Sequence, residues 1–137
     1  MDLQKFLDAQ ETVISDVYAE LTRGKKSSHW MWFVFPQLTS LGRSATAIKY
    51  GIESIEQAQA YLAHPLLRSR LLRCIELALY HPTRTANEIF GYPDDLKFQS
   101  SMTLFREAEP DLPHFQQALD TFYNGAPDEK TIELLKY

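Results

Sequence analysis

Apolar residues recur at helical spacing along most of this 137-residue chain, and runs that alternate apolar and polar residues are missing. Residues 3–23 predict one amphipathic helix, which Gly24 suits as a C-terminal stop. Capping boxes at 54–57 and 85–88 mark two helix starts, and Pro65 suits the first turn of another. Beyond the first helix, helices are expected at 42–50, 54–62, 65–80, 85–90, 94–107, 112–123 and 127–137. We therefore predict an all-α fold of about seven to eight helices, several of them short.

The composition is ordinary for a globular protein, with 45% hydrophobic and 23% charged residues. The length is close to that of a typical domain, so we expect residues 1–137 to form a single helical domain. The sequence does not begin with a basic segment followed by an apolar run, and no window approaches the length of a membrane span. These patterns predict a cytoplasmic protein that has no membrane partner.

Charge and cysteine content narrow the classes of function. The formal net charge is −4 and no basic stripe is evident, which argues against a nucleic-acid partner. The clearest basic cluster is Arg68, Arg70 and Arg73, with Arg84 close in sequence; it is interpreted either as a solvated helix face or as a local anion site. Cys74 is the only cysteine, so an intrachain disulfide and a cysteine-rich zinc site are excluded, and we expect it in the core.

The most unusual mixture of side chains lies in residues 25–37, KKSSHWMWFVFPQ. Both tryptophans of the chain, Trp30 and Trp32, stand here among two phenylalanines. His29 and Gln37 add polar groups, and two lysines precede the run. Aromatic side chains dominate cores and binding sites, and polar groups placed among them need partners from the protein or from a ligand. Periodicity does not decide whether this run is a short buried helix or a strand.

A second unusual segment covers residues 94–105, DDLKFQSSMTLF. Its apolar residues fall on more than one side of a helix, which is typical of a helix buried between neighbours. The polar residues that would then lie in a crowded place are Lys97, Ser100, Ser101 and Thr103. Serine and threonine can bond to the backbone four residues earlier, or they can face a ligand. Lys97 either reaches solvent, pairs with Asp94 or another carboxylate, or faces a pocket.

Several common signatures of chemistry do not occur in the sequence. There is no glycine-rich phosphate loop, no His-Glu-x-x-His set and no Gly-x-Ser-x-Gly elbow. The four histidines are scattered. No metal site is therefore predicted, and spacing assigns neither a cofactor nor a nucleophile.

Residues 26–37 resemble the signature of the family called domain of unknown function 1810, in the form Lys26-x-Ser28-His29-Trp30-Met31-Trp32-Phe33-Val34-Phe35-Pro36-Gln37. Further matches are Leu41-Gly42-x-Ser44 with Ala47 and Tyr50, Ala58 with Tyr61-Leu62-x-His64-Pro65, Ile89-Phe90-Gly91 with Asp94-Asp95-x-Lys97, and Ser100-Ser101-Met102-Thr103-Leu104-Phe105. The resemblance covers nearly the whole chain. Arg68 departs from the resemblance, because we expect glycine at this position of the family pattern. The departure affects only the prediction of where the local helix starts.

The resemblance implies a small, mainly bacterial protein with an all-α fold in one compact domain. It implies no reaction, cofactor or partner. Members of the family sometimes carry the label "calpastatin". We reject that label for this chain, because the inhibitor of that name is disordered, whereas the composition and the capping pattern here require a folded core.

Two hypotheses about function follow from the two unusual segments. In the first, residues 25–37 and 94–107 converge on a pocket for a small anionic ligand, such as a nucleotide or an ADP-ribose-like molecule. Trp30 or Trp32 would stack on its planar group and Lys97 would meet its anionic group. Hydrogen bonds would come from His29, Gln37, Ser100, Ser101 and Thr103. If the site is catalytic, His29 and Asp95 are the expected acid–base groups.

In the second hypothesis the chain is a non-catalytic protein-interaction module. The aromatic run is then part of the core or a docking patch, and the polar face of the second segment is satisfied within the protein. An exposed tryptophan without an enclosing pocket would favour this hypothesis. The sequence does not identify the protein partner.

Overall fold

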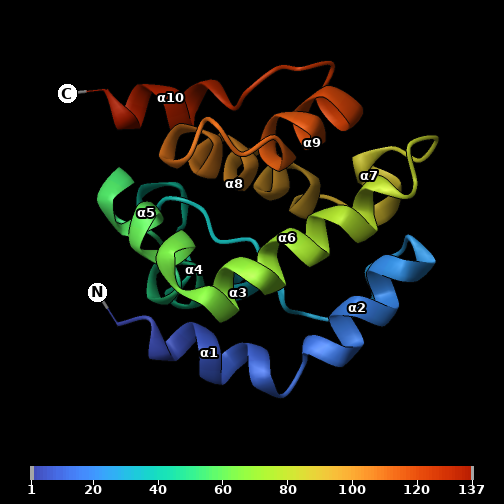
Figure 1. Ribbon diagram of the computed structural model, residues 1–137, viewed down its shortest axis with the longest axis horizontal. Helices are drawn as coiled ribbons and strands as arrows, with labels where there is room; N and C mark the ends of the chain where they lie inside the picture. Colours follow the sequence, from blue (N-terminus) through green and yellow to red (C-terminus); the bar gives the residue numbers. More distant parts are fainter. Residues whose placement is uncertain (1, 137) are drawn as a thin grey trace.

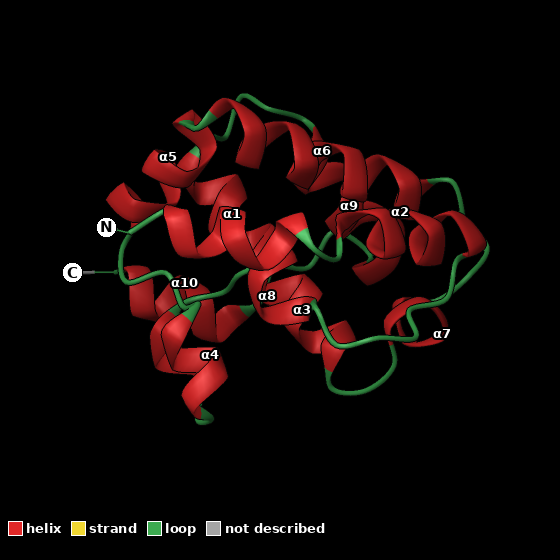
Figure 2. Ribbon diagram, turned by 90° about the horizontal axis from the view of Figure 1, so that it is seen from below, coloured by secondary structure: helices red, strands yellow, loops and turns green. Residues whose placement is uncertain are grey.

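The computed structural model describes residues 2–136, and this part of the chain is helical, with loops and one isolated bridge between the helices (Figures 1 and 2). The helices are α1 (Gln4–Glu11), α2 (Ile14–Arg23), α3 (Met31–Val34), α4 (Ala45–Lys49), α5 (Ile55–Ala63), α6 (Pro65–Leu79), α7 (Ala86–Phe90), α8 (Asp94–Ala108), α9 (His114–Tyr123) and α10 (Glu129–Leu135), with a 3₁₀ turn, η1, at Thr39–Leu41. The prediction of an all-α fold is confirmed.

The described residues hold more helices than the seven to eight expected, and the first difference is near the N-terminus. Residues 3–23 form two helices, α1 and α2, that meet at Thr12 and Val13. Residues 12–14 are all β-branched, which lowers helix propensity there. The two helices also pack on different neighbours, α1 on α3 and α2 on α6, so the chain bends between them. The aromatic run adds another element, since its centre forms the short helix α3.

Helix α8 lies at the centre of the packing, as the spread of its apolar residues predicted. It contacts α5, α7, α9 and α10, and its buried residues lie all around its axis. Helix α6 crosses the middle of the view in Figure 1 and packs against α2, α5 and α9. Ser100, Ser101 and Thr103 of α8 are buried together with its apolar residues.

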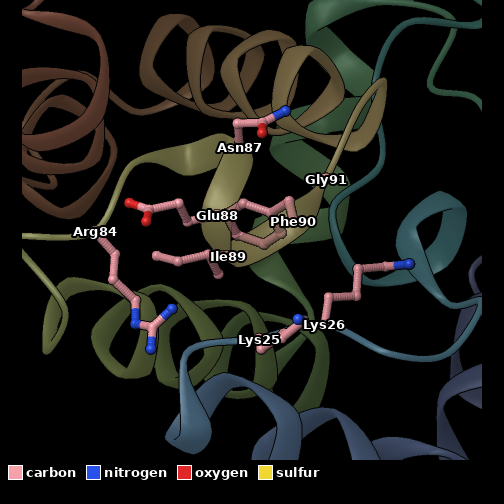
Figure 3. A pocket seen from close by; sticks show the side chains of 8 residues that line it. All are labelled: Lys25, Lys26, Arg84, Asn87, Glu88, Ile89, Phe90 and Gly91. Carbon is pink, nitrogen blue, oxygen red and sulfur yellow. The ribbon is translucent and has the colours of Figure 1, made fainter.

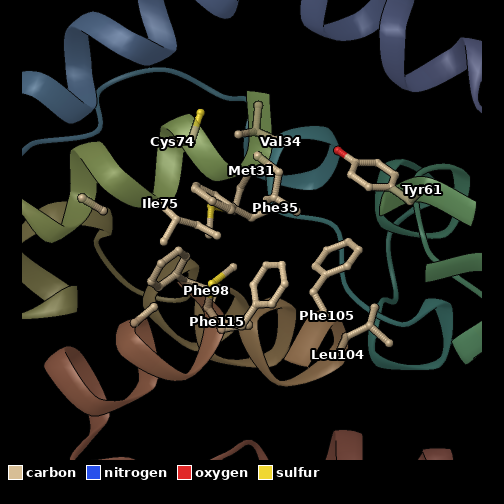
Figure 4. Packing of buried hydrophobic residues seen from close by; sticks show 14 of the residues in the cluster. Met31, Val34, Phe35, Tyr61, Cys74, Ile75, Phe98, Leu104, Phe105 and Phe115 are labelled. Carbon is tan, nitrogen blue, oxygen red and sulfur yellow. The ribbon is translucent and has the colours of Figure 1, made fainter. Parts of the chain in front are cut away.

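The core is rich in aromatic rings that come from segments far apart in the sequence. Phe98 makes an edge-to-face contact with Phe35 at 4.9 Å between ring centroids, and it stacks on Phe90 at 4.5 Å. Figure 4 shows this face of α8 directed at the aromatic run. Cys74 is buried in the same core, as expected, and burial raises the pKa of its thiol to about 12, so the thiol stays protonated and unreactive at neutral pH.

Local capping signals set most of the helix starts. The hydroxyls of Ser44, Ser54 and Thr85 each accept a hydrogen bond from the backbone N–H three residues later. Only 85–88 forms the complete reciprocal box, because the Gln57 carboxamide bonds to the N–H of residue 53 and not to that of the capping serine. Gly24 ends α2 with a positive φ of 73°, as its position predicted.

Residues 35–54, which include η1 and α4, form a connection whose two ends lie side by side. Leu38 and Ile52 form an isolated parallel bridge, and the Thr39 N–H donates to the Ile52 carbonyl at 2.9 Å. A Cβ on Gly51 would lie 2.6 Å from Thr39 Cα, so glycine permits this close approach. The connection thereby holds Gln37 in place beside the aromatic run. None of the helices in residues 2–136 combines the length and the apolar character that a membrane crossing requires.

Candidate functional site

A groove of about 390 Å³ lies between the aromatic segment and the start of α8. The two unusual segments of the sequence therefore lie side by side and line one groove. Its volume is within the range of about 300–1,000 Å³ that is typical of small-molecule sites. The residues that line it are Lys26, Ser27, Ser28, His29, Met31, Trp32, Tyr92, Pro93, Asp94 and Lys97.

The floor of the groove carries a trio of charged side chains. Lys26 Nζ lies 2.9 Å from one carboxylate oxygen of Asp94, and Lys97 Nζ lies 3.6 Å from the other. Lys26 also donates to the Ser28 carbonyl at 2.6 Å, and only 8% of its side chain is exposed. Two ammonium groups thus face one carboxylate, and the trio carries a net positive charge. An anionic group in the groove would be attracted to this charge, because the low-dielectric walls reduce screening.

Trp32 and Tyr92 provide the aromatic surface of the groove. Trp32 is half-buried, and Lys97 Nζ lies 5.4 Å from the centroid of its ring, within cation–π range. Tyr92 lies directly before α8 and is 78% exposed. A flat, partly apolar group and an anionic group could therefore be accommodated next to each other.

The loop that leads into the groove is held by Glu20 of α2, which is only 4% exposed. Its Oε1 accepts hydrogen bonds from the backbone N–H of Ser27 at 2.6 Å, from that of Ser28 at 3.0 Å and from Nε1 of Trp30 at 3.0 Å. Its Oε2 accepts the Ser28 hydroxyl. Burial alone would raise the pKa of the Glu20 carboxyl, but these four hydrogen bonds outweigh it and lower the pKa to about 2. The carboxylate is therefore charged at neutral pH and organises residues 27–30.

The aromatic run contributes its residues to two different places. Trp30 is completely buried, with its ring beneath Lys26 Nζ at 5.0 Å, so it is a core residue and not a groove residue. Trp32 and the exposed His29 line the groove. Gln37 lines a small adjoining cavity that shares Met31, Trp32 and Lys97 with the groove. Of the two tryptophans proposed for stacking, only Trp32 reaches this site.

The hydroxyls predicted for ligand binding on α8 lie elsewhere. Ser100 Oγ donates to the Leu96 carbonyl and to the carboxylate of Asp128, which caps α10. Thr103 Oγ1 donates to the Gln99 carbonyl and accepts the Asp128 N–H at 2.9 Å. Ser101 is fully buried and its hydroxyl finds no partner among residues 2–136. The structure thus places these three side chains in the interior of the protein and not along the groove.

The two acid–base candidates are also separated by the structure. His29 lines the groove, but Asp95 does not. One oxygen of Asp95 accepts the Leu96 N–H at 3.0 Å, and the other accepts the Asn87 side chain at 3.4 Å. The carboxylate that does line the groove is that of Asp94.

Sequence reasoning missed Glu20 and Tyr92, and it treated Asp94 only as a partner for Lys97. Glu20 had a detectable signal, because it falls on the apolar face of its helix beside Val17 and Leu21. Tyr92 had none, since an exposed tyrosine before a proline is typical of many loops.

The arginines of the basic cluster lie in different surroundings in the structure. Arg70 is buried and contacts Glu11 at 2.7 Å, whereas Arg68 pairs with Glu109 at 2.6 Å. Arg84 lines another cavity.

Within residues 2–136, no three histidine, cysteine, aspartate or glutamate side chains gather closely enough to hold a metal ion.

The fold and the groove define a small all-α domain whose most aromatic segment borders a polar groove. The chain belongs to the family described as "Protein of unknown function (DUF1810)", whose profile matches residues 1–135, and this confirms the resemblance found in the sequence. It is similar to the crystal structure of the conserved hypothetical protein Rv1873 from Mycobacterium tuberculosis. The identity is 50%, the TM-score is 0.96, and the match covers 98% of this chain and 96% of that one. No curated protein matches the chain.

Proposed function

We propose that this protein binds a small anionic ligand with a planar group, such as a nucleotide or an ADP-ribose-like molecule, in the groove between residues 26–32 and α8. The observation that carries this proposal is the position of Lys97. Its ammonium lies both over the Trp32 ring and beside Asp94. A cation and an aromatic surface are thereby held together in one groove, and these are the two groups that a nucleotide needs for its phosphate and its base.

The remaining lining residues supply polar contacts of the right kind. Ser27 and His29 bring a hydroxyl group and an imidazole to the wall of the groove, whereas the Ser28 hydroxyl donates to Glu20. Gln37 lines only the adjoining cavity of about 10 Å³, which is too small for a ligand group, so we assign it no contact with the ligand. Because Lys26 is already paired with Asp94, Lys97 is the more available cation, with 25% of its side chain exposed.

The proposal concerns binding and assigns no reaction. His29 is the acid–base candidate that lines the groove, while Asp95 faces α7. A proton transfer in the groove would therefore depend on His29, because the Asp94 carboxylate that also lines the groove is already contacted by both lysines.

A thermal-shift screen of the purified protein against nucleotides, NAD derivatives, ADP-ribose and common metabolites tests the proposal. A ligand that binds only the folded state at about 100 times its Kd adds about 2.7 kcal/mol to stability and raises Tm. We expect this shift to disappear in Trp32→Ala and Lys97→Ala. Lys49→Ala is the matched control, because Lys49 also lies over an aromatic ring, that of Tyr50 at 5.2 Å, but does not line the groove. A shift that Lys97→Ala leaves intact would contradict the proposal.

The alternative function, a non-catalytic protein-interaction module, is favoured by one observation. Tyr92 and Leu96 are 78% and 50% exposed, and they stand four residues apart at the start of α8, beside the groove. Exposed apolar side chains that gather in this way are typical of contact surfaces. The same screen separates the two functions, because an interaction module would show no shift with any small molecule of the panel.

A further inference from the structure

A second cavity, of about 370 Å³, adjoins the groove. Lys26 belongs to the lining of both, so the two spaces meet at this residue. The backbone N–H of Lys26 donates to the Ile89 carbonyl at 2.7 Å and ties the loop after α2 to α7. The other residues that line the second cavity are Lys25, Arg84, Asn87, Glu88, Phe90 and Gly91 (Figure 3).

The charge of this cavity is positive, although the whole chain carries a net charge of −4. The side chains that line it include three cations, Lys25, Lys26 and Arg84, and one carboxylate, that of Glu88. Glu88 is occupied locally, because its Oε1 accepts the Thr85 N–H at 2.8 Å in the capping box. Lys26 is paired with Asp94 on the side of the groove.

Lys25 and Arg84 are the two cations that the protein leaves available here. Both are exposed, and neither forms an ion pair with another residue in the range 2–136. Figure 3 shows both side chains on the same side of the cavity, while the Lys26 side chain extends away from them. Both side chains line one cavity. Guanidinium and ammonium groups are the cations that bind phosphate oxygens in proteins.

We propose that the second cavity binds a phosphate or diphosphate group of the same ligand whose planar group lies at Trp32. The ligand is then extended: its ring lies at Trp32, its first phosphate meets Lys97 and passes Lys26, and its terminal phosphate reaches Lys25 and Arg84. A nucleoside diphosphate has this order of groups, whereas an uncharged nucleoside would occupy the groove alone. This inference rests on the proposed function, because it names the ligand class of that site.

The test compares ligands that differ only in the anionic group. The four common ribonucleosides, the corresponding nucleoside diphosphates and inorganic pyrophosphate are titrated calorimetrically into the wild-type protein and into Lys25→Ala/Arg84→Ala. Because both side chains are exposed, this double variant is expected to fold normally. Arg73→Ala is the matched control, since Arg73 is also an exposed arginine but lies on α6, outside both cavities.

We expect at least one nucleoside diphosphate to bind wild-type protein about tenfold or more tightly than its nucleoside, as two charge-assisted contacts imply. The double variant should lose most of this advantage while its affinity for the nucleoside stays the same, and Arg73→Ala should keep both affinities. The advantage should also decrease as the NaCl concentration rises. If the advantage survives in full in the double variant, the inference is wrong and the proposed function stands. If the diphosphate and the nucleoside bind equally well, no cation of either cavity recognises the anionic group, and both proposals are overturned.

If the proposed function itself is wrong, a different set of compounds will bind. If no nucleoside or nucleoside diphosphate binds but pyrophosphate does, and the double variant loses that binding, the cavity is a separate anion site. Both the extended ligand and the nucleotide groove are then overturned. If none of these compounds binds, both proposals are likewise overturned.

Discussion

The indole Nε1 of Trp30 donates a hydrogen bond of 3.0 Å to Oε1 of Glu20, and this bond connects α2 to the aromatic run. Because the same carboxylate accepts both backbone N–H groups of residues 27 and 28, the indole ring and the loop are fixed together. Trp30 and Trp32 are only two residues apart, so the buried ring sets the position from which the other ring faces the groove. Glu20 therefore supports the site without lining it.

Replacing Glu20 by glutamine should destabilise the protein strongly. An amide oxygen can replace only part of the carboxylate's acceptor capacity, and the amide NH₂ would face donors. Leaving buried donors without an acceptor costs about 2–4 kcal/mol in a network of this kind. Urea denaturation at pH 7 measures the loss. Glu133→Gln, which changes an exposed carboxylate on α10, should stay within about 0.5 kcal/mol of wild type, and an equally small effect for Glu20→Gln would contradict this role.

The same carboxylate predicts a defined response to acid. Its pKa is lowered from 4.5 to about 2, so the unfolded state binds more protons than the folded state between these values. The stabilisation is fully present above pH 4.5 and is lost as pH falls toward 2, in total about 3 kcal/mol. Denaturation curves of wild type and Glu20→Gln at pH 5 and at pH 2.5 should therefore converge at the lower pH. A difference that does not depend on pH would show that ionisation of Glu20 is not its cause.

Thr103 should matter for the docking of α10 and not for ligand binding. Thr103→Val keeps the shape of the side chain but removes the hydroxyl that accepts the Asp128 N–H at 2.9 Å. That N–H is then left without a partner. We expect a loss of about 1–2 kcal/mol and faster amide hydrogen exchange in α10, with an unchanged ligand-induced shift in Tm. Thr121→Val, an exposed position on α9, is the control. If Thr103→Val lost the ligand-induced shift in Tm, the Thr103 hydroxyl would have to belong to the binding site.

The ion pair between Arg68 and Glu109 should contribute little. The guanidinium reaches both carboxylate oxygens, at 2.8 and 2.6 Å, but 35% of each side chain is exposed. Arg68 stands where the resemblance led us to expect glycine, but α6 begins at Pro65 and runs through this position without a break. A double-mutant cycle of Arg68→Ala and Glu109→Ala should give a coupling of about 0.5–1 kcal/mol that weakens in 1 M NaCl. A coupling above about 2 kcal/mol would show that solvent does not screen the pair.

Helix starts could be predicted from the sequence because capping involves residues only three or four positions apart. Ser54 and Thr85 both cap helices at the positions that the predicted boxes gave. The break at Thr12 could not be predicted from periodicity, since the apolar spacing continues across it. It depends on the different partners of α1 and α2, and those partners are distant in sequence.

The candidate site, like the helices, could be predicted from the sequence only in part. Residues 25–37 and the start of α8 were recognisable from their mixture of aromatic and polar side chains, and they line one groove. Which polar groups face that groove was not recognisable. On a helix buried on all sides, the periodicity gives no outward direction, so it did not show that Lys97 lines the groove while Thr103 faces α10.

The sequence by itself determined the helical class, the caps and the segment in which aromatic and polar groups are concentrated, because these depend on local spacing and side-chain chemistry. Only the tertiary structure decided that Lys97 faces Trp32 and Asp94, that Thr103 holds α10, and that Glu20 organises the loop before α3. The reason is physical: a buried polar group is defined by the partner that satisfies it, and chain folding brings these partners from other elements.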